Sequence, residues 1–413
     1  MIGKQLVRAL EDDWKATLDA VARARRWPTS ADVARLGEKV TKLSRAYNDS
    51  APRASTPADA GDLAARLGFS FARDVPKGAG AVRELVATGV LALVPERPLR
   101  VLDLGAGLGA STWGLARALD AAGARGELRA TWVDSDRGAL EAGAAIVRSR
   151  GGAAGNVRVH VDMAAHALAR AVERDGAAPR ERFDVVLLGQ VLSELDRGID
   201  SGERVARHAA MIGALLEASL EPSGALVVIE PALRDRTRHL HHVRDALLGA
   251  TRAPTLFAPC LHAAPCPALL HEGDWCHEDL AIDLPSWLVP VARAAGLRYQ
   301  GLTFSYLVLR RDGRTLAAEI ARDASSRGHA LRVVSDAFVT KGKREVFLCG
   351  ALDAAEGGAE RVVARARVMR LDRERNDANA PLDEARRGDL VELDPAPKID
   401  RPRIGSTTHV RVR

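Results

Sequence analysis

The chain has 413 residues, of which 47% are hydrophobic, 28% charged and 4% aromatic. This length allows roughly two to four domains, and the composition is that of an ordinary folded protein. No apolar run approaches the roughly 18 residues of a membrane-spanning helix. The first residues have neither the apolar core of a secretion signal nor the acid-poor composition of a mitochondrial presequence. We therefore expect a cytoplasmic protein with no membrane contact.

The excess positive charge lies towards the C-terminus. The net charge is +6, and residues 310–413 hold 22 Lys and Arg against 17 Asp and Glu. Such a segment suits an acidic partner, with nucleic acid first, although a mixed, solvated surface has the same charge. Five basic residues are candidates for binding RNA phosphates: Arg310, Arg311, Lys341, Lys343 and Arg344.

The first 95 residues have a helical pattern. Apolar residues recur at helical spacing over 14–22 and 33–43, and a polar break follows over 48–57. Further helix is expected over 63–67 and 81–91. This N-terminal region is predicted to be a helical cap.

Strands and helices alternate over residues 96–312. Strands are predicted over 100–104, 128–133, 157–161, 183–188, 225–229 and 302–309, and the first helices over 109–121 and 139–148. This alternation predicts an α/β, Rossmann-like domain with a mostly parallel sheet. Over residues 313–413, a small β-rich domain is predicted from strands at 331–334, 345–349, 361–369, 389–393 and 408–412.

A glycine loop follows the first of these strands, in the run Asp103-Leu104-Gly105-Ala106-Gly107-Leu108-Gly109. Gly105, Gly107 and Gly109 permit a tight turn and let a ligand approach the backbone. With Ala110 as the last small residue, the spacing also fits a dinucleotide fingerprint loosely. Asp103 favours S-adenosylmethionine, because a carboxylate can orient its cationic methionine end but is unfavourable beside a pyrophosphate. The run resembles motif I of the class I methyltransferases.

Acidic residues follow the next two strands. Asp134, or alternatively Asp136, is expected to accept hydrogen bonds from the ribose hydroxyls of the ligand. By the same resemblance, Asp162 would meet the adenine amino group. Each acid taken singly is equally suited to cap the next helix. Together with the glycine loop, the acids favour a nucleoside site.

The segment after the fourth strand offers no identifiable catalytic residue. It has neither the Pro-Pro-aromatic motif of amino-methylating enzymes nor the Pro-Cys nucleophile of C5-pyrimidine enzymes. Gln190 is assigned to the cofactor site, and Ser193 and Glu194 are placed to contact a substrate. The alternative for this segment is a helix start with a capping pair.

Four cysteines form a second candidate site. Cys260, Cys266 and Cys276 lie in an insert over about residues 250–285, and Cys349 lies in the β-rich segment. Four thiolates can hold zinc or an iron–sulfur cluster, and four reduced, unlinked cysteines are the plainer alternative. The proline-rich loop suits a bulky cluster at least as well as zinc. Three histidines are substitute zinc ligands: His262, His271 and His277.

Taken in order, these motifs resemble the methyltransferase-like assembly factors of the mitochondrial small ribosomal subunit and their bacterial relatives. The resemblance spans about residues 99–390 and includes the glycine run with Thr112-Trp113, residues 191–195, 228–231, 341–344 and 385–390, and the four cysteines. It implies S-adenosylmethionine binding, a [4Fe-4S] cluster on those cysteines, and docking on small-subunit rRNA. Residues 232–234 and Arg387 depart from the family pattern. These departures affect the details of the expected substrate surface and not the cluster.

We therefore expect a monomeric, methyltransferase-like protein that binds S-adenosylmethionine and acts on small-subunit rRNA or in small-subunit assembly. The cluster would join the insert to the C-terminal domain. Whether the protein transfers a methyl group, or uses the ligand structurally while acting as an assembly factor, stays open. The alternative is a small-molecule or protein methyltransferase with a structural four-cysteine zinc site. A nicotinamide-dependent enzyme is disfavoured by Asp103.

Overall fold

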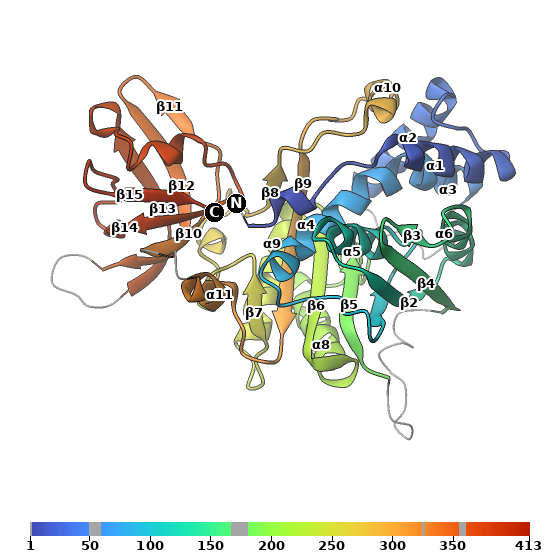
Figure 1. Cartoon of the computed structure of the whole chain (residues 1–413), viewed down its shortest axis with the longest axis horizontal. Coiled ribbons are helices and arrows are strands. Elements are labelled where there is room, and N and C mark those ends of the chain that lie inside the picture. Colours follow the sequence, from blue (N-terminus) through green and yellow to red (C-terminus); the bar gives the residue numbers. More distant parts are fainter. Residues whose placement is uncertain (1, 49–58, 167–180, 324–325, 327, 355–360) are drawn as a thin grey trace.

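Two sheets organise the chain, as Figure 1 shows for the computed structural model. The structure describes residues 2–48, 59–166, 181–323, 326, 328–354 and 361–413. The larger sheet belongs to an α/β half, and the smaller sheet, orange to red, forms a separate body beside it. Most of the predicted polar break over 48–57 lies outside the described residues.

The N-terminal region is helical, as predicted. It contains α1 (Asp12–Ala24), α2 (Val33–Asn48), α3 (Ala60–Ala65), a π-helical turn over Arg66–Ser70, and α4 (Phe71–Ala87). The two short helices expected over 63–67 and 81–91 are thus one continuous helical run, which includes Pro76. Almost every residue of α4 is buried, polar ones included, so the polar residues of this helix do not mark a solvent-exposed face.

The larger sheet contains every strand predicted for the α/β segment. Its strands are β1 (Leu99–Leu104), β2 (Gly126–Asp134), β3 (Ala153–Ala154), β4 (Val157–Ala165), β5 (Phe183–Gly189), β6 (Leu220–Glu230), β7 (Thr255–Ala258) and β9 (Leu302–Arg310). Their order is β3-β4-β2-β1-β5-β6-β9-β7, and β8 (Glu278–Leu280) also pairs with β9. The strands β4, β2, β1, β5 and β6 are parallel, whereas β9 runs antiparallel to both β6 and β7.

Helices cover both faces of this sheet: α4, α5 (Ala110–Ala121), α6 (Arg137–Ser149), α8 (Ser201–Ala218) and α9 (Arg234–Leu248). The short helix α10 (Val289–Ala294) packs instead against α2. Alternate residues of β1 enter opposite cores. Val101 packs in the cluster that includes Trp113 of α5, and Leu102 packs in the cluster that includes Leu240 of α9. Burial on both faces explains the nearly unbroken apolar strands of the sequence. None of the described helices combines the length and apolar character needed to cross a bilayer.

The smaller sheet is antiparallel, which agrees with the predicted β-rich segment. After α11 (Leu316–Arg322) it contains β10 (His329–Val333), β11 (Phe338–Thr340), β12 (Lys343–Asp353), β13 (Arg361–Leu371), β14 (Leu390–Asp394) and β15 (His409–Val412). The order is β11-β12-β10-β14-β15, and β13 pairs with β12. Leu348, Val368 and Leu393 lie in a core of its own. Short 3-10 turns occur at Lys4–Leu6, Pro267–Leu270, Ser286–Leu288, Asp372–Glu374 and Ala380–Asp383.

Buried charges join the two halves. Glu84 of α4 accepts a 2.6 Å bond from Arg332 of β10 and a 2.8 Å bond from the Tyr306 hydroxyl of β9. Next to them, Arg83 pairs with Glu278 of β8 at 3.0 Å. The chain termini lie close together at this junction (Figure 1).

Candidate functional site

The glycine loop lies at the carboxyl end of β1, where the chain turns into α5. Gly105, Gly107 and Gly109 have φ values of 68°, 53° and 81°. A Cβ at Gly109 would lie 2.0 Å from the Trp132 ring, and one at Gly105 would lie 2.5 Å from Val191. At Gly107 nothing lies within 4 Å of that position. Two glycines are thus required by packing, and Gly107 borders open space for a ligand.

Asp134 ends β2 beside this loop. Its two carboxylate oxygens accept backbone N–H bonds, one from Gly107 at 2.7 Å and one from Asp136 at 2.8 Å. Each oxygen has a second lone pair, so both can still accept a ligand hydroxyl. Burial raises the pKa of Asp134. Asp136 instead caps α6 by accepting from the amide of Ala139 at 3.0 Å, which favours Asp134 for the ribose role.

Asp103 lies behind the loop. Its side chain is buried and accepts a 2.7 Å bond from the Thr112 hydroxyl, which in turn accepts from the Trp132 indole at 2.9 Å. Burial raises the pKa of Asp103 to about 7. In this arrangement the carboxyl group anchors the first turn of α5, which carries the glycine loop.

Replacing Asp103 with Asn should flatten the dependence of stability on pH. Because its pKa rises from 3.8 to about 7 on folding, the folded state binds more protons over this window, and stability from this group falls as pH rises. Asparagine keeps an acceptor for Thr112 but does not titrate. Urea denaturation at pH 5 and pH 7.5 measures the difference, and an identical pH slope in both proteins would contradict the assignment.

The predicted positions of Asp162 and of the segment after β5 differ from those observed. Asp162 was expected at a strand end, but β4 continues to Ala165, and Asp162 is an exposed residue within the strand. Strand pairing places Asp134 opposite Ala165, so Asp162 does not reach the edge where Asp134 lies. Gln190 is at that edge, with a φ of 61°, and its backbone N–H donates to the Ile229 carbonyl at 2.6 Å.

Glu230 holds the segment after Gln190 in place. Its buried carboxylate accepts from the amides of Leu192 at 2.8 Å and Ser193 at 3.2 Å. Burial raises the pKa of Glu230 to about 7. The capping pair expected at a helix start is therefore wrong, because this segment is a series of turns and α8 begins only at Ser201. In the sequence, the position of Glu230 at a strand end, directly before Pro231, is the feature that could have indicated this role.

Arg66 is a site residue that sequence reasoning missed. Its guanidinium lies 3.7 Å from the Asp136 carboxylate, and its Nε atom is buried without a hydrogen-bond partner. Burial opposes its charge, but Tyr47, Glu194, Asp136 and Asp134 raise the pKa of Arg66 overall. The residue starts the π-helical turn, a feature frequent at functional sites. No periodicity in the N-terminal region indicates such a position.

The fold brings the four cysteines together. Each pair among them interacts electrostatically, although Cys349 comes from β12 and the other three from the insert. Burial, and then the neighbouring thiols, raise the pKa of Cys266 to about 11 and that of Cys276 to about 12. All four are free of disulfides.

Helix α9 supports this four-cysteine site. Arg244, fully buried, donates to the His262 carbonyl at 2.9 Å and pairs with Asp245. Asp245 accepts from the Cys266 amide at 2.9 Å. A buried cation thus stands beside thiols that would bind as anions.

The histidines do not join the thiols around a single point. His262 Nε2 lies 3.7 Å from the Cys349 sulfur, whereas His277 stacks on Trp275. Within the described residues, no three His, Cys, Asp or Glu side chains are close enough together to hold one metal ion.

The predicted RNA-binding residues lie in two places. Arg310 ends β9, where it is buried and bonds to Asp312 and to the Ser223 carbonyl at 2.8 Å. Arg311 pairs with Glu217 at 3.1 Å. The other three surround the turn between β11 and β12. There Lys341 is exposed, Lys343 pairs with Glu345, and Arg344 pairs with Asp383.

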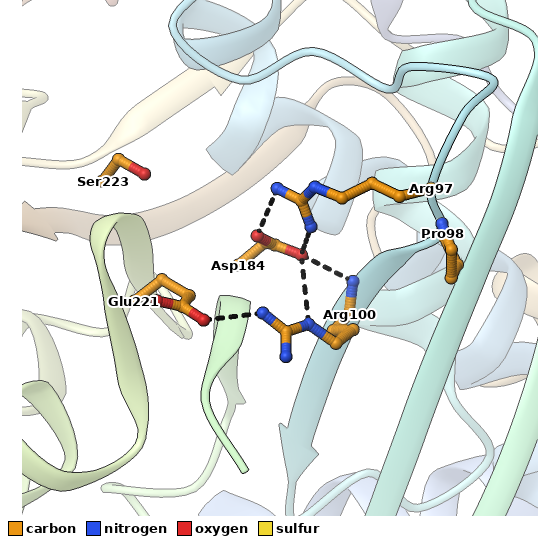
Figure 2. Close-up of a pocket in the computed structure, with 6 residues that line it drawn as sticks. All are labelled: Arg97, Pro98, Arg100, Asp184, Glu221 and Ser223. Carbon is orange, nitrogen blue, oxygen red and sulfur yellow. Dashed lines mark hydrogen bonds and ion pairs between the residues drawn. The ribbon is translucent and has the colours of Figure 1, made fainter.

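A hollow of about 420 Å³ lies at the opposite end of the sheet, where β1, β5 and β6 begin (Figure 2). Arg97 bonds to both oxygens of Asp184 at 2.8 and 2.9 Å, and Arg100 bonds to Glu221 at 2.6 Å. The charges lining this hollow therefore satisfy one another and hold the strand starts together, away from the glycine loop.

The strand order and the glycine loop define a class I methyltransferase fold. Five parallel strands, with an antiparallel strand inserted before the last edge strand, have the loop and Asp134 at their carboxyl ends. A family profile described as mitochondrial small ribosomal subunit Rsm22 matches residues 81–369. The chain belongs to this family, which confirms the resemblance found in the sequence.

The chain is similar to several solved methyltransferases. Plantazolicin methyltransferase BpumL, in complex with a monoazolic desmethylPZN analogue and SAH, is 10% identical over 73% of this chain and 97% of its own, with a TM-score of 0.33. An O-methyltransferase family protein from Burkholderia thailandensis is 20% identical over 66% and 71%, with a TM-score of 0.31. A methyltransferase homologue from Pyrococcus horikoshii is 14% identical over 58% and 66%, with a TM-score of 0.34. Among curated proteins, no sequence matches significantly.

Proposed function

We propose that this protein binds S-adenosylmethionine at the glycine loop and acts on small-subunit rRNA or in assembly of the small ribosomal subunit. One observation carries the cofactor proposal. The Asp134 carboxylate accepts a 2.7 Å bond from the backbone N–H of Gly107, and nothing lies within 4 Å of where a Cβ at Gly107 would be. Asp134, Glu194 and the buried Glu230 lie at this edge, with the Arg66 guanidinium beside Asp134 and Glu194. Family membership supports the ribosomal partner.

Replacing Asp134 with Ala should weaken binding of S-adenosylhomocysteine about 10- to 100-fold. This range corresponds to losing hydrogen bonds to a charged group. Isothermal calorimetry on the full chain measures it. Glu127→Ala is the matched control, because Glu127 is on the same strand with its side chain 48% exposed. Equal affinities of Asp134→Ala and wild type would remove Asp134 from the ribose position.

The four cysteines are proposed to hold a [4Fe-4S] cluster. Their chemistry fits, because four unpaired thiols from the insert and β12 gather beside the buried Arg244. When bound, the cluster would link the insert to β12, and its role would be structural.

No residue is assigned to methyl transfer. The chain's own contribution at the glycine loop is to bind and orient the ligand through Gly107, Asp134 and Gln190. The segment held by Glu230 closes the same edge. A methyl-transferring enzyme and an assembly factor with a structural ligand both fit this arrangement. A methylation assay with tritium-labelled S-adenosylmethionine on immature small subunits separates them.

A small-molecule or protein methyltransferase with a four-cysteine zinc site is the second candidate. The same thiol set favours it, since zinc also binds four thiolates. It predicts one zinc, no sulfide and no co-sedimentation with small subunits. We further propose that the protein is a monomer and that it is cytoplasmic. The cytoplasmic location is in keeping with four cysteines free of disulfides.

A further inference from the structure

The face of the smaller sheet opposite its core carries a row of aromatic and arginine side chains. Val346 and Leu348 of β12, and Ala366 and Val368 of β13, point into the core. Side chains alternate along a strand, so the residues between them point to the opposite face of the sheet, where Cys349 and Arg365 meet the insert. On β12 and β13 these include Phe347, which pairs across the strands with Arg367, and Cys349, which pairs with Arg365.

These side chains contact one another in sequence. Arg367 lies 5.5 Å from the ring centre of Phe338 on β11, and Phe338 meets Phe347 edge-on at 6.2 Å. Arg365 then lies 4.8 Å from the ring centre of Phe347. We call Arg367, Phe338, Phe347 and Arg365 the aromatic row. Cation–π contacts hold the two guanidinium groups against the rings.

The aromatic row is open at its β11 end. Phe338 is 46% exposed, and the Arg367 side chain is 52% exposed. Strand β11 has only three residues, all exposed, and among the described strands it pairs with β12 alone. Phe338 and the 66% exposed Val339 thus lie on an edge strand whose unpaired backbone side can still accept a partner.

The surroundings of the row are positively charged. Lys341 stands in the turn after β11, and Lys343, Arg365 and Arg367 lie on the same side of the sheet. Glu345 and Asp274 pair with three of these cations, which leaves the group positive. An exposed ring beside cations matches a nucleobase with its phosphate better than it matches an apolar protein surface.

We propose that the aromatic row binds single-stranded RNA, with a base stacked on Phe338 and neighbouring phosphates on Lys341 and Arg367. The inference deepens the proposed function, since it rests on RNA being the partner. It also specifies the form of that RNA. Bases within a duplex are already stacked and present no free face, so the row selects unpaired nucleotides.

Phe338→Leu should weaken binding of a short, fluorescein-labelled single-stranded RNA by about five- to hundredfold, as expected from losing one base stack. Binding of the same strand within a duplex should hardly change. The salt dependence should keep its slope, because no phosphate contact is lost, whereas Lys341→Ala should reduce that slope by about one. Fluorescence anisotropy on the full, anaerobically purified chain measures all three.

Two further variants make the test specific. Phe338→Trp retains a stacking ring and should keep wild-type affinity. Val339→Ala changes an adjacent residue, 66% exposed, whose side chain points to the other side of the strand, and it should also bind as wild type. Equal affinities of Phe338→Leu and wild type would overturn the stacking proposal alone. Absence of any RNA binding by the wild-type chain would overturn both this proposal and the rRNA part of the proposed function.

Discussion

Replacing Glu84 with Gln is expected to lower the free energy of unfolding by about 3–5 kcal/mol. The side chains of Glu84 and Arg332 are 2% and 5% exposed, and they pair at 2.6 Å. Arg83 and Glu278 complete the group, so two cations balance two acids. A neutral amide leaves one buried positive charge uncompensated, which is the costly state in a dry interior. Urea denaturation followed by fluorescence and circular dichroism measures the loss.

The control for this prediction is an exposed pair. Arg137 and Glu141 pair at 3.0 Å with side chains 82% and 60% exposed, and Glu141→Gln should change stability by less than about 1 kcal/mol. The double variant Glu84→Gln with Arg332→Met removes both members of the buried pair and should recover part of the loss. If Glu84→Gln costs no more than Glu141→Gln, the buried charges do not hold the two halves together.

Cys276→Ser should lose the proposed cluster and loosen the smaller sheet. The wild-type chain, purified without oxygen, should contain roughly four irons with matching acid-labile sulfide. Cys276 is one of four mutually close thiols, and the insert that carries it contacts the smaller sheet through Asp274 and Arg365. Without the cluster, limited proteolysis should therefore cut the C-terminal segment faster.

Ala263→Ser is a suitable control, because it adds the same hydroxyl to the exposed loop between Cys260 and Cys266 and keeps all four thiols. It should retain wild-type iron and sulfide. Unchanged iron and sulfide in Cys276→Ser would contradict the four-ligand assignment. One zinc without sulfide in the wild type would instead favour the second candidate function and leave the glycine-loop site untouched.

Most of the fold could be predicted, because parallel strands buried on both faces are nearly continuous apolar runs. The six predicted strands of the α/β half are all present. Helix α4 could not be predicted with correct bounds, because Lys77, Arg83 and Glu84 are buried by pairing with partners distant in sequence or on the helix itself. Strands β7 and β8 were missed because three or four residues are too few to show alternation.

The candidate sites were predictable where backbone geometry demands a residue type. Gly105 and Gly109 are fixed by the side chains of Val191 and Trp132. Asp162 shows the limit of this reasoning, since the sequence prediction ends the strand at residue 161, whereas the hydrogen-bonded strand continues to Ala165. Arg66 and the aromatic row depend on contacts between segments, which no local pattern records.

The packing of α4 against α5 has a thermodynamic consequence. A Cβ at Gly114 of α5 would lie 2.4 Å from the Val75 carbonyl, so the two helix backbones touch with no side chain to absorb a shift. One helix of about 25 Å therefore adjoins both the element that follows the glycine loop and, through Glu84, the smaller sheet. If a ligand at the loop moves α5, α4 should move with it and shift the Glu84–Arg332 pair. If the two proposed sites are coupled in this way, reciprocity requires RNA on the smaller sheet to change cofactor affinity by the same factor as cofactor changes RNA affinity.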